Sequence, residues 1–195
     1  MDDAKRPEGD DGRAARLRAA AAAEVHRHRG LVRTARHGRI LSALMLPMVQ
    51  VSPPAGYGVL TTVGRRTGRR RRKCLRVVCQ GERAYLVQLV PPHLGLTRPG
   101  AVTSWVHNIR ANPRVRLRVR GGTVTGTARE ITDPIEAARA RSALCDTVYP
   151  IDYIEAALHL RGRPTLAKIV DLHRYWFDTG HPLVIEWAAT SRRGE

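Results

Sequence analysis

The densest group of chemically active side chains lies in the stretch GRRTGRRRRK at residues 64–73, where seven of the ten residues are Arg or Lys. It separates two apolar runs, YGVLTTV and CLRVVC, and so joins two predicted strands. Each guanidinium can donate two parallel hydrogen bonds to a phosphate or a carboxylate, and the amides of a turn can add further donors. The stretch therefore predicts a site for a phosphate or for an extended polyanion.

The same stretch does not match two familiar phosphate loops. It lacks the Gly-Lys-Ser/Thr ending of a P-loop and the three-glycine spacing of a dinucleotide fingerprint. A solvated basic hairpin is the structural alternative. The chain also shows no carboxylate pair, no Ser-His-Asp order and no metal-ligand spacing. Hydrolysis and metal chemistry therefore have no support, and no metal site is expected.

The strands that must position this stretch are short and rich in β-branched residues. They are expected at 57–62, 73–80 and 84–90. A fourth strand alternates strictly, because arginines separate Val115, Leu117 and Val119, and Gly121-Gly122 turns it back into a fifth strand. Antiparallel strands in this arrangement predict a small barrel.

Helical patterns surround these strands. The segment TSWVHNIRANP predicts a helix capped by Thr103 or Ser104 and ended before Pro113, after a proline-rich loop long enough to be functional. Asp133 and Pro134 supply a cap and a first-turn proline for a following helix. Further helices at 151–160 and 166–176 precede a last strand, PLVIEW. The predicted fold class is α+β, a mostly antiparallel β-barrel with flanking helices.

The N-terminal part of the chain differs from the rest in composition. Residues 1–13 have almost no apolar content and are expected to form a disordered tail. Residues 14–55 are predicted to be a helical segment, whose second helix, RHGRILSALMLPMVQV, joins basic residues to a short apolar run. That helix either covers the open end of the barrel or rests on a membrane surface. Residues 56–195 are assigned to the barrel domain, with a helical insertion at about 134–178.

The bulk composition narrows the partners and the location. The 195 residues are 43% hydrophobic, which is enough for one domain core, and the formal charge of +17 predicts anionic partners. The three cysteines form no disulfide or metal pattern. No secretory signal or membrane-spanning run is recognised, so we expect a cytoplasmic location, with membrane association left open.

Two segments carry a family resemblance. VLTTVGRRTGRRRRKCLRVV at 59–78 and SWVHNIRANPRVRLRV at 104–119 resemble the deazaflavin-dependent nitroreductase family in their order, their spacing and the Ala-Asn-Pro end of the helix. The resemblance implies a split β-barrel that binds the deazaflavin coenzyme F420, a hydride carrier with a phosphate and an oligoglutamate tail. The cationic stretch would then hold that phosphate and tail.

The resemblance also implies roles for individual residues. The phosphate and the acidic tail would contact Arg65, Arg66, Thr67 and Arg71, with Arg72 and Lys73 beside them. The ring would lie against Val87, Gln88 and Leu89, and the start of a helix would close over it with Ser104, Trp105, His107 and Asn108. The tyrosines Tyr149 and Tyr153 would border the substrate space, and one of them or His107 would supply a proton.

The implied activity is hydride transfer from reduced F420 to a small electrophilic acceptor: a quinone, an enone or a nitro compound. A homodimer and a peripheral membrane contact are compatible with this reductase. Arg70, Cys74, Val90 and Val106 depart from the family pattern, and a segment at about 156–176 has no counterpart in its short members. Because of these departures, the resemblance defines the identity of the acceptor less well than that of the cofactor.

Three alternatives stay open on the sequence alone. FMN or haem could occupy the same barrel, although FMN has no polyanionic tail that would use so many arginines. A nucleic-acid-binding barrel is disfavoured, because such barrels stack bases on aromatic side chains and the central strands offer only Tyr57 and Tyr85. The third alternative is an F420-binding protein without catalytic turnover.

Overall fold

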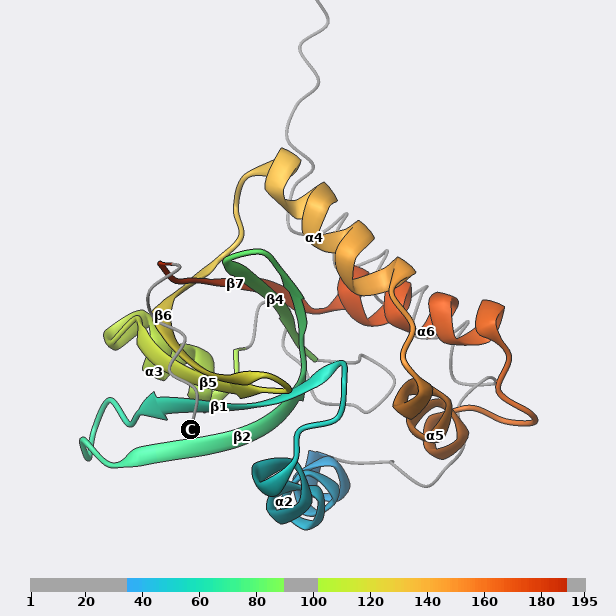
Figure 1. Ribbon diagram of the computed structural model, residues 1–195, viewed down its shortest axis with the longest axis horizontal. Helices are drawn as coiled ribbons and strands as arrows, with labels where there is room; N and C mark the ends of the chain where they lie inside the picture. The colour runs from blue at the N-terminus through green and yellow to red at the C-terminus, as the bar shows by residue number, and fades with distance from the viewer. Residues whose placement is uncertain (1–34, 90–101, 189–195) are drawn as a thin grey trace, which may run out of the picture.

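The computed structural model describes residues 35–89 and 102–188. They form one antiparallel sheet of seven strands in the order β2-β1-β5-β6-β7-β4-β3 (Figure 1). The strands are β1 (Tyr57–Val63), β2 (Arg70–Arg76), β3 (Val78–Gln80), β4 (Arg83–Gln88), β5 (Arg114–Val119), β6 (Gly122–Glu130) and β7 (His181–Glu186).

The sheet curls into a barrel because its two edge strands are consecutive in the chain. Strands β2 and β3 stand at opposite ends of the sheet order, yet only Val77 separates them. The amide of Val77 donates to the carbonyl oxygen of Gly56 at 2.8 Å, which holds the bend against the start of β1. The predicted fold class, a mostly antiparallel barrel with flanking helices, is confirmed.

Strand β2 begins earlier than the apolar pattern predicts. One strand is expected at 73–80, whereas the chain forms β2 and β3. The four cations at 70–73 belong to β2 and pair with β1, from Val63 opposite Arg70 to Leu60 opposite Lys73. Only residues 64–69 form the turn. The last four cations of the stretch therefore alternate between the two faces of a strand.

The barrel interior is filled by every second side chain of each strand. Its buried members include Leu60, Leu75, Leu86, Leu117, Leu183 and Ile185. On β5, Val115 and Leu117 point inward while Arg114 and Arg116 are exposed, as the strict alternation predicts. The inward set makes the core, and the outward arginines leave the wall of the barrel strongly basic.

Five helices surround the barrel in the described residues. They are α2 (Ala35–Val51), α3 (Ser104–Ala111), α4 (Pro134–Asp146), α5 (Pro150–His159) and α6 (Leu166–Thr179). Helix α3 packs against β1 and β6, whereas α4, α5 and α6 lie between β6 and β7 in the chain, outside the barrel (Figure 1). Helix α4 packs along α6.

Two helix starts depend on a proline in the first turn. The Asp133 carboxylate accepts from the amide of Glu136 at 2.7 Å and caps α4, with Pro134 in its first turn, as predicted. Pro150 occupies the same place in α5, where the missing N–H would have no helical partner. Pro150 thus begins a helix rather than interrupting one, and Tyr149 stands at its N-cap.

Helix α2 packs on the outer wall of the barrel, against β1 and β2. The contact is made by Met45, Leu46 and Val49 on the helix and by Tyr57, Val59 and Cys74 on the strands. The helix therefore covers an outer face rather than the open end. In the described part of the chain, no helix is long and apolar enough to cross a membrane. The predicted tail, the first predicted helix and most of the proline-rich loop lie outside the described residues.

Candidate active site

A tight turn at residues 64–69 joins β1 to β2. The amide of Gly64 donates to the carbonyl oxygen of Arg69 at 2.9 Å, and the Gly64 carbonyl accepts from the amide of Gly68 at 2.8 Å. Gly68 has φ 64°, a left-handed conformation that disfavours a side chain. The closed turn holds the exposed side chains of Arg65 and Arg66 at the tip of the hairpin.

The inside of this turn is closely packed. A Cβ on Gly64 would lie 3.1 Å from the Thr67 hydroxyl oxygen and 3.2 Å from the carbonyl oxygen of Arg69. The same hydroxyl oxygen accepts from the amide of Arg69 at 3.4 Å. Thr67, predicted to contact the phosphate, thus also holds the shape of the turn.

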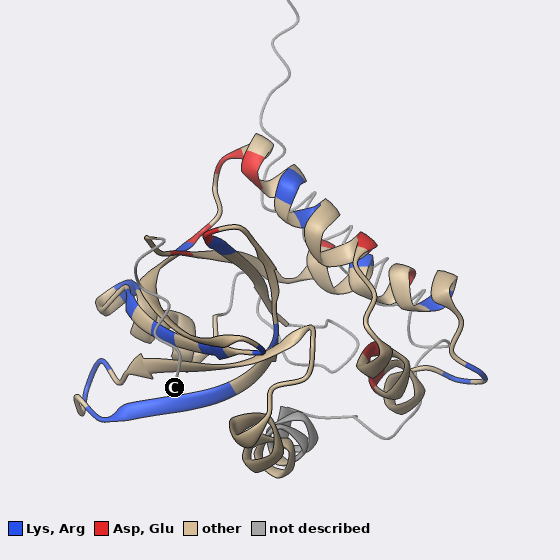
Figure 2. Cartoon of the chain, viewed as in Figure 1, with Lys and Arg blue, Asp and Glu red and all other residues tan. Residues whose placement is uncertain are grey.

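The cations of β2 divide between two faces. Arg71 stands opposite Thr62, and Lys73 stands opposite Leu60, whose side chain lies in the barrel core. Arg70 and Arg72 therefore point to the outer face. The predicted phosphate site is split accordingly, because Arg71 and Lys73 share the inner face while Arg72 lies on the other side. Figure 2 shows the band of cations along β2 and on both arms of its hairpin turn.

Lys73 is the most enclosed of these cations. Its side chain is half-buried, whereas the neighbouring arginines are exposed. Burial lowers the pKa of the Lys73 ammonium, because desolvation penalises the charged form. An ammonium that has lost part of its hydration gains more from a bound anion than a fully hydrated one does. Lys73 is therefore well suited to an anionic ligand on the inner face.

Asn108 of α3 connects the helix to the hairpin. Its side-chain oxygen accepts from the amide of Arg65 at 3.1 Å, and its side-chain nitrogen donates to the hydroxyl of Thr62 at 3.3 Å. The Asn108 side chain is buried. Both of its polar atoms are thus engaged within the protein, and it positions the arginine turn against the end of β1.

Gln88 makes the corresponding contact at the other end of α3. Its side-chain oxygen accepts from the amide of Thr103 at 2.7 Å and from the Thr103 hydroxyl at 3.0 Å. Thr103 is the N-cap residue, as predicted, but its hydroxyl bonds to Gln88 instead of the first turn of the helix. Gln88 is buried and fixes where α3 begins.

The remaining predicted residues of this region differ in burial. Leu89 and Ser104 are exposed, and Val87 and His107 are half-buried. Trp105 packs into the barrel core and is buried. The exposed and half-buried side chains are available to a ligand, whereas the Trp105 ring is largely used for packing.

The two predicted tyrosines lie far from the arginine turn. The ring of Tyr149 contacts Gly56, directly before β1, whereas the turn follows the other end of β1. Seven residues of strand place these ends about 20 Å apart, at roughly 3.3 Å per residue. Tyr153 lies one turn along α5 and is 40% exposed. The structure therefore does not gather the predicted residues at one point, and a ligand touching both groups must be extended.

A shallow cavity of about 230 Å³ lies at the Tyr149 end of the barrel. Its aromatic walls are Tyr57, Tyr149 and Trp187, and Arg120 stands with the glycines of the β5–β6 turn on its rim. Both of those glycines have positive φ, as their hairpin turn requires. The cavity lining mixes aromatic and polar groups and includes one cation, unlike the dense cation cluster of the hairpin.

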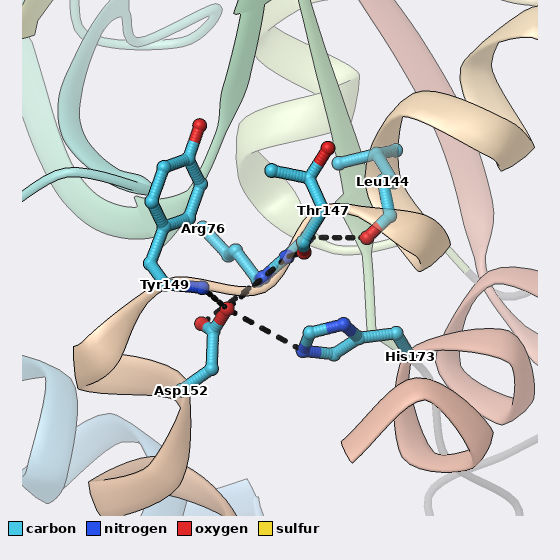
Figure 3. A network of polar contacts seen from close by, with 6 residues as sticks. All are labelled: Arg76, Leu144, Thr147, Tyr149, Asp152 and His173. Carbon is cyan, nitrogen blue, oxygen red and sulfur yellow. Dashed lines mark hydrogen bonds and ion pairs between the residues drawn. The ribbon is translucent and has the colours of Figure 1, made fainter. Parts of the chain in front are cut away.

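A buried polar network ties the tyrosine-bearing helix to the barrel (Figure 3). The Arg76 guanidinium donates to Asp152 Oδ1 at 3.3 Å, to the carbonyl oxygen of Leu144 at 2.8 Å and to that of Thr147 at 2.6 Å. Asp152 Oδ2 accepts from the amide of Tyr149 at 2.8 Å. This one carboxylate therefore fixes the start of α5 and its attachment to β2.

Two more titratable groups border this network. Burial lowers the pKa of His173, whose Nε2 lies 4.0 Å from Asp152, to about 4, so the imidazole is neutral at pH 7. Burial raises the pKa of the Glu155 carboxyl to about 7, and the Tyr57 hydroxyl is hydrogen-bonded to it. The junction thus holds the Arg76–Asp152 ion pair and one carboxyl, Glu155, that titrates near neutrality.

The sequence interpretation missed Arg76, Asp152, Glu155 and His173. Arg76 could have been predicted as a member of an ion pair, because an arginine inside the apolar run CLRVVC must either pair with a buried acidic group or lie on the exposed face of its strand. Asp152 could have been predicted as a capping residue, because it lies three residues after Tyr149, the N-cap of α5. In the residues that the structure describes, no group of three potential metal ligands is present.

A curled antiparallel sheet with a basic hairpin and a helix fastened across it is a split β-barrel. Residues 46–155 match the F420H(2)-dependent quinone reductase family. This match spans more than half of the chain, and the chain belongs to that family. It is an F420H2-dependent oxidoreductase, and its cofactor is coenzyme F420.

Solved structures with similar folds carry several cofactors. An F420-H2 dependent reductase, FDR-A, is 18% identical and covers 69% of this chain and 97% of its own, with a TM-score of 0.43. A FAD-binding protein from Mesorhizobium loti is 17% identical over 75% of this chain and 90% of its own, with a TM-score of 0.40. A heme binding protein from Mycobacterium smegmatis is 15% identical over 67% and 45%, with a TM-score of 0.41. No curated protein matches the sequence.

Proposed function

We propose that this protein transfers a hydride from F420H2 to a quinone. The observation that carries the proposal is the family match over residues 46–155, a range that includes the cationic hairpin and all barrel strands except β7. When bound, the reduced coenzyme supplies the hydride. The protein binds and orients the two reactants and excludes water from them.

The inner-face cations fit the phosphate of the coenzyme. Arg71 and Lys73 project from the same face of β2, and the Lys73 ammonium is partly desolvated. Arg65 and Arg66 stand exposed at the tip of the adjoining turn. Guanidinium and ammonium groups are the usual phosphate donors, so this set has the required chemistry. We assign the phosphate to Arg71 and Lys73, with Asn108 holding the turn in place.

The ring is assigned to the place where β4 meets α3. Gln88 fixes the start of α3 through Thr103. The neighbouring side chains Leu89 and Ser104 are exposed there, and Val87 is half-buried. An apolar surface beside polar helix-start groups suits a flat ring with polar edges. In this assignment Gln88 is a positioning residue and Leu89 and Ser104 are contact residues.

Quinone reduction consumes one hydride and one proton, so the acceptor also needs a proton donor. Tyr153 is exposed on α5, Tyr149 is packed against Gly56, and His107 is half-buried on α3. A donor must come within hydrogen-bond reach of the acceptor oxygen. We assign this role to Tyr153 before Tyr149 and His107, because its hydroxyl-bearing side chain is the most accessible of the three.

Fluorescence titration with F420, in parallel with FMN, tests the cofactor assignment. The Arg71→Gln, Lys73→Gln double variant should bind F420 at least about tenfold more weakly, because it loses charge-assisted contacts. The Arg139→Gln, Arg163→Gln variant removes two exposed cations elsewhere and serves as the control of equal net charge. Equal weakening of both variants, or a preference for FMN, would contradict the assignment.

Anaerobic mixing of the F420H2-loaded protein with acceptors tests the reaction. Oxidation of F420H2 should be faster with a quinone than with an enone or a nitro compound of similar potential. The Tyr153→Phe variant should slow that step without changing F420 affinity. F420 binding without oxidation by any of these acceptors would instead identify a non-catalytic F420-binding protein.

The outward side of α2 supports a peripheral membrane contact. Ile40, Leu44, Met48 and Val51 are 50%, 73%, 56% and 80% exposed, and they follow one another at helical spacing on the side away from the barrel. An exposed apolar stripe of this kind typically lies against lipid or protein. We propose a bilayer surface as its partner, which would also bring the protein close to lipid-soluble quinones.

Vesicle flotation tests this contact. The wild-type protein should float with anionic vesicles, and the Leu44→Ser, Met48→Ser variant should remain with the soluble fraction. A homodimer that buries the same stripe is the competing outcome. Light scattering without vesicles would then report a dimer that the same two substitutions dissociate.

A further inference from the structure

A groove runs between two connecting segments of the chain at the end of the barrel opposite the hairpin. One wall is the connection from α2 to β1, and the other is the turn from β5 to β6 with its flanking residues, 118–123. Two cavities of about 210 and 230 Å³ follow each other along the first wall, beside residues 51–53 and 54–57 respectively. Because residues 119–122 line both cavities, they form one continuous groove, which we call the far-end groove.

The first cavity has the donors for an anion. Arg118 and Arg120 both line it, together with the hydroxyl-bearing residues Ser52 and Thr123. Arg118 donates to the carbonyl oxygen of Val51 at 3.4 Å, a long hydrogen bond that leaves other N–H groups of its guanidinium for a ligand. Arg120 is exposed and also lines the second cavity. The described residues that line the two cavities include neither Asp nor Glu, so no acidic side chain there competes for these cations.

The second cavity has aromatic walls that are fixed by the fold. Tyr149 is half-buried at the start of α5, and Trp187 is buried beside the barrel core. The amide of Trp187 donates to the carbonyl oxygen of Glu82 at 3.1 Å, which fixes its backbone. Gly121 and Gly122 stand between the two cavities without side chains, so a ligand can approach the turn closely. Rigid aromatic walls beside an open turn suit a flat ring.

The far-end groove is remote from the place assigned to the coenzyme. Val119, at the end of β5, pairs with Gly58 near the start of β1, whereas the cationic turn follows the other end of β1. Gln88, beside the assigned ring site, pairs with His181 at the start of β7, whereas Trp187 directly follows the end of β7. Strands of seven and six residues place the two ends about 20 Å apart, at roughly 3.3 Å per residue.

We propose that the far-end groove is a second ligand site, which binds a small aromatic anion: a flat ring that carries a carboxylate or a phosphate. The charged group lies with Arg118 and Arg120, and the ring lies against Tyr149 and Trp187. Small-molecule sites usually enclose about 300–1,000 Å³, and each cavity alone is smaller than that, so the ligand spans both. The site is separate from hydride transfer, and its ligand does not compete with F420.

Calorimetric titration of the F420-saturated protein tests this inference, because saturation occupies the cations assigned to the coenzyme. The probes are phenyl phosphate and benzoate, with inorganic phosphate as the anion without a ring and benzyl alcohol as the ring without a charge. The variant is Arg120→Gln. Its control of equal net charge is Arg163→Gln, at an exposed position on the loop between α5 and α6. Thermal unfolding checks that each variant folds.

The wild type should bind one or both aromatic anions at least about tenfold more tightly than inorganic phosphate or benzyl alcohol. The stronger of the two identifies the charged group as a phosphate or a carboxylate. Arg120→Gln should weaken that binding roughly fivefold to tenfold, because it loses charge-assisted hydrogen bonds, and should bind F420 as the wild type does. Arg163→Gln should follow the wild type. The ligand should also change tryptophan fluorescence, and Trp187→Phe should remove most of that change.

Three results would overturn the inference. Binding of neither aromatic anion would show that the groove takes no such ligand. Equally tight binding of inorganic phosphate would show that the ring is not recognised. Unchanged affinity in Arg120→Gln, or an affinity that F420 saturation lowers, would place the bound anion elsewhere on the protein.

Discussion

Arg76 of β2 and Asp152 of α5 are 76 residues apart in the chain and form a buried ion pair, with Nε 3.3 Å from Oδ1. The Asp152 side chain is fully buried, and Arg76 uses its remaining nitrogens on the carbonyl oxygens that end α4. This pair makes the helical insertion and the barrel one unit. It also fixes the start of α5, the segment that carries both predicted tyrosines, Tyr149 and Tyr153.

Breaking this pair from one side should unfold the junction. The Asp152→Ala variant leaves the buried Arg76 charge without a counter-ion, and we expect a loss of about 3–5 kcal/mol in the free energy of unfolding. The Asp152→Ala, Arg76→Met double variant should recover part of that loss. Urea denaturation of the four members of this cycle measures the coupling. Additive effects of the two substitutions would contradict the pairing.

The Glu155 carboxyl should make stability depend on pH. Burial raises its pKa from the ordinary 4.5 to about 7, and the groups facing it are Tyr57, Cys74, Arg76 and Asp152. In the unfolded chain the Glu155 carboxyl ionises at its ordinary pKa of 4.5, whereas in the folded protein it stays neutral up to about pH 7. The stability that the neutral carboxyl contributes is therefore fully present below pH 4.5. It is lost as the pH rises through 7. The loss amounts to about 3 kcal/mol.

The Glu155→Gln variant isolates this effect. Its free energy of unfolding relative to wild type should rise by about 3 kcal/mol between pH 4.5 and pH 8, since glutamine stays neutral. His173, whose pKa is lowered to about 4, acts in the opposite direction, because its contribution is lost as the pH falls from 6.5 to 4. That effect is common to both proteins and cancels in the comparison. Parallel stability curves for the two proteins would refute the prediction.

Lys73 should show a trade-off between stability and binding. The half-buried ammonium is desolvated, so Lys73→Met should raise the unfolding temperature while lowering F420 affinity by roughly tenfold. Calorimetry and fluorescence titration measure the two effects on one preparation. Arg139→Met, at an exposed position on α4, is the control, because it removes a cation without relief of burial and away from the hairpin. A Lys73→Met variant that binds F420 normally would exclude Lys73 from the phosphate site.

Gly56 should be needed for the position of Tyr149. It has φ 86°, and a Cβ there would overlap the Tyr149 ring. Gly56→Ala should therefore cost about 2 kcal/mol or more and expose the tyrosine, which near-UV circular dichroism would report. Gly81→Ala is the control, because Gly81 has φ 58° and nothing lies near its Cβ position. Equal costs at the two positions would show that backbone strain alone acts.

The local features of the fold were predictable because they follow from nearby residues. The alternation of Val115 and Leu117 with arginines set the inward and outward sides of β5, and Asp133 with Pro134 marked the start of α4. The start of β2 was not predictable from apolar pattern, because Arg70–Lys73 have no apolar residue to reveal a strand. These residues form a strand because their backbone N–H and C=O groups pair with those of β1.

The sequence by itself determined that this chain carries a cationic hairpin in an antiparallel barrel and belongs with proteins that bind an anionic cofactor. Only the tertiary structure decided which cations act together. The register of β2 on β1 puts Arg71 with Lys73 and turns Arg72 away, and it brings Arg72 into line with Arg116 on a distant part of the chain. Strand register is a property of the pairing between segments, since a shift of one residue exchanges the two faces.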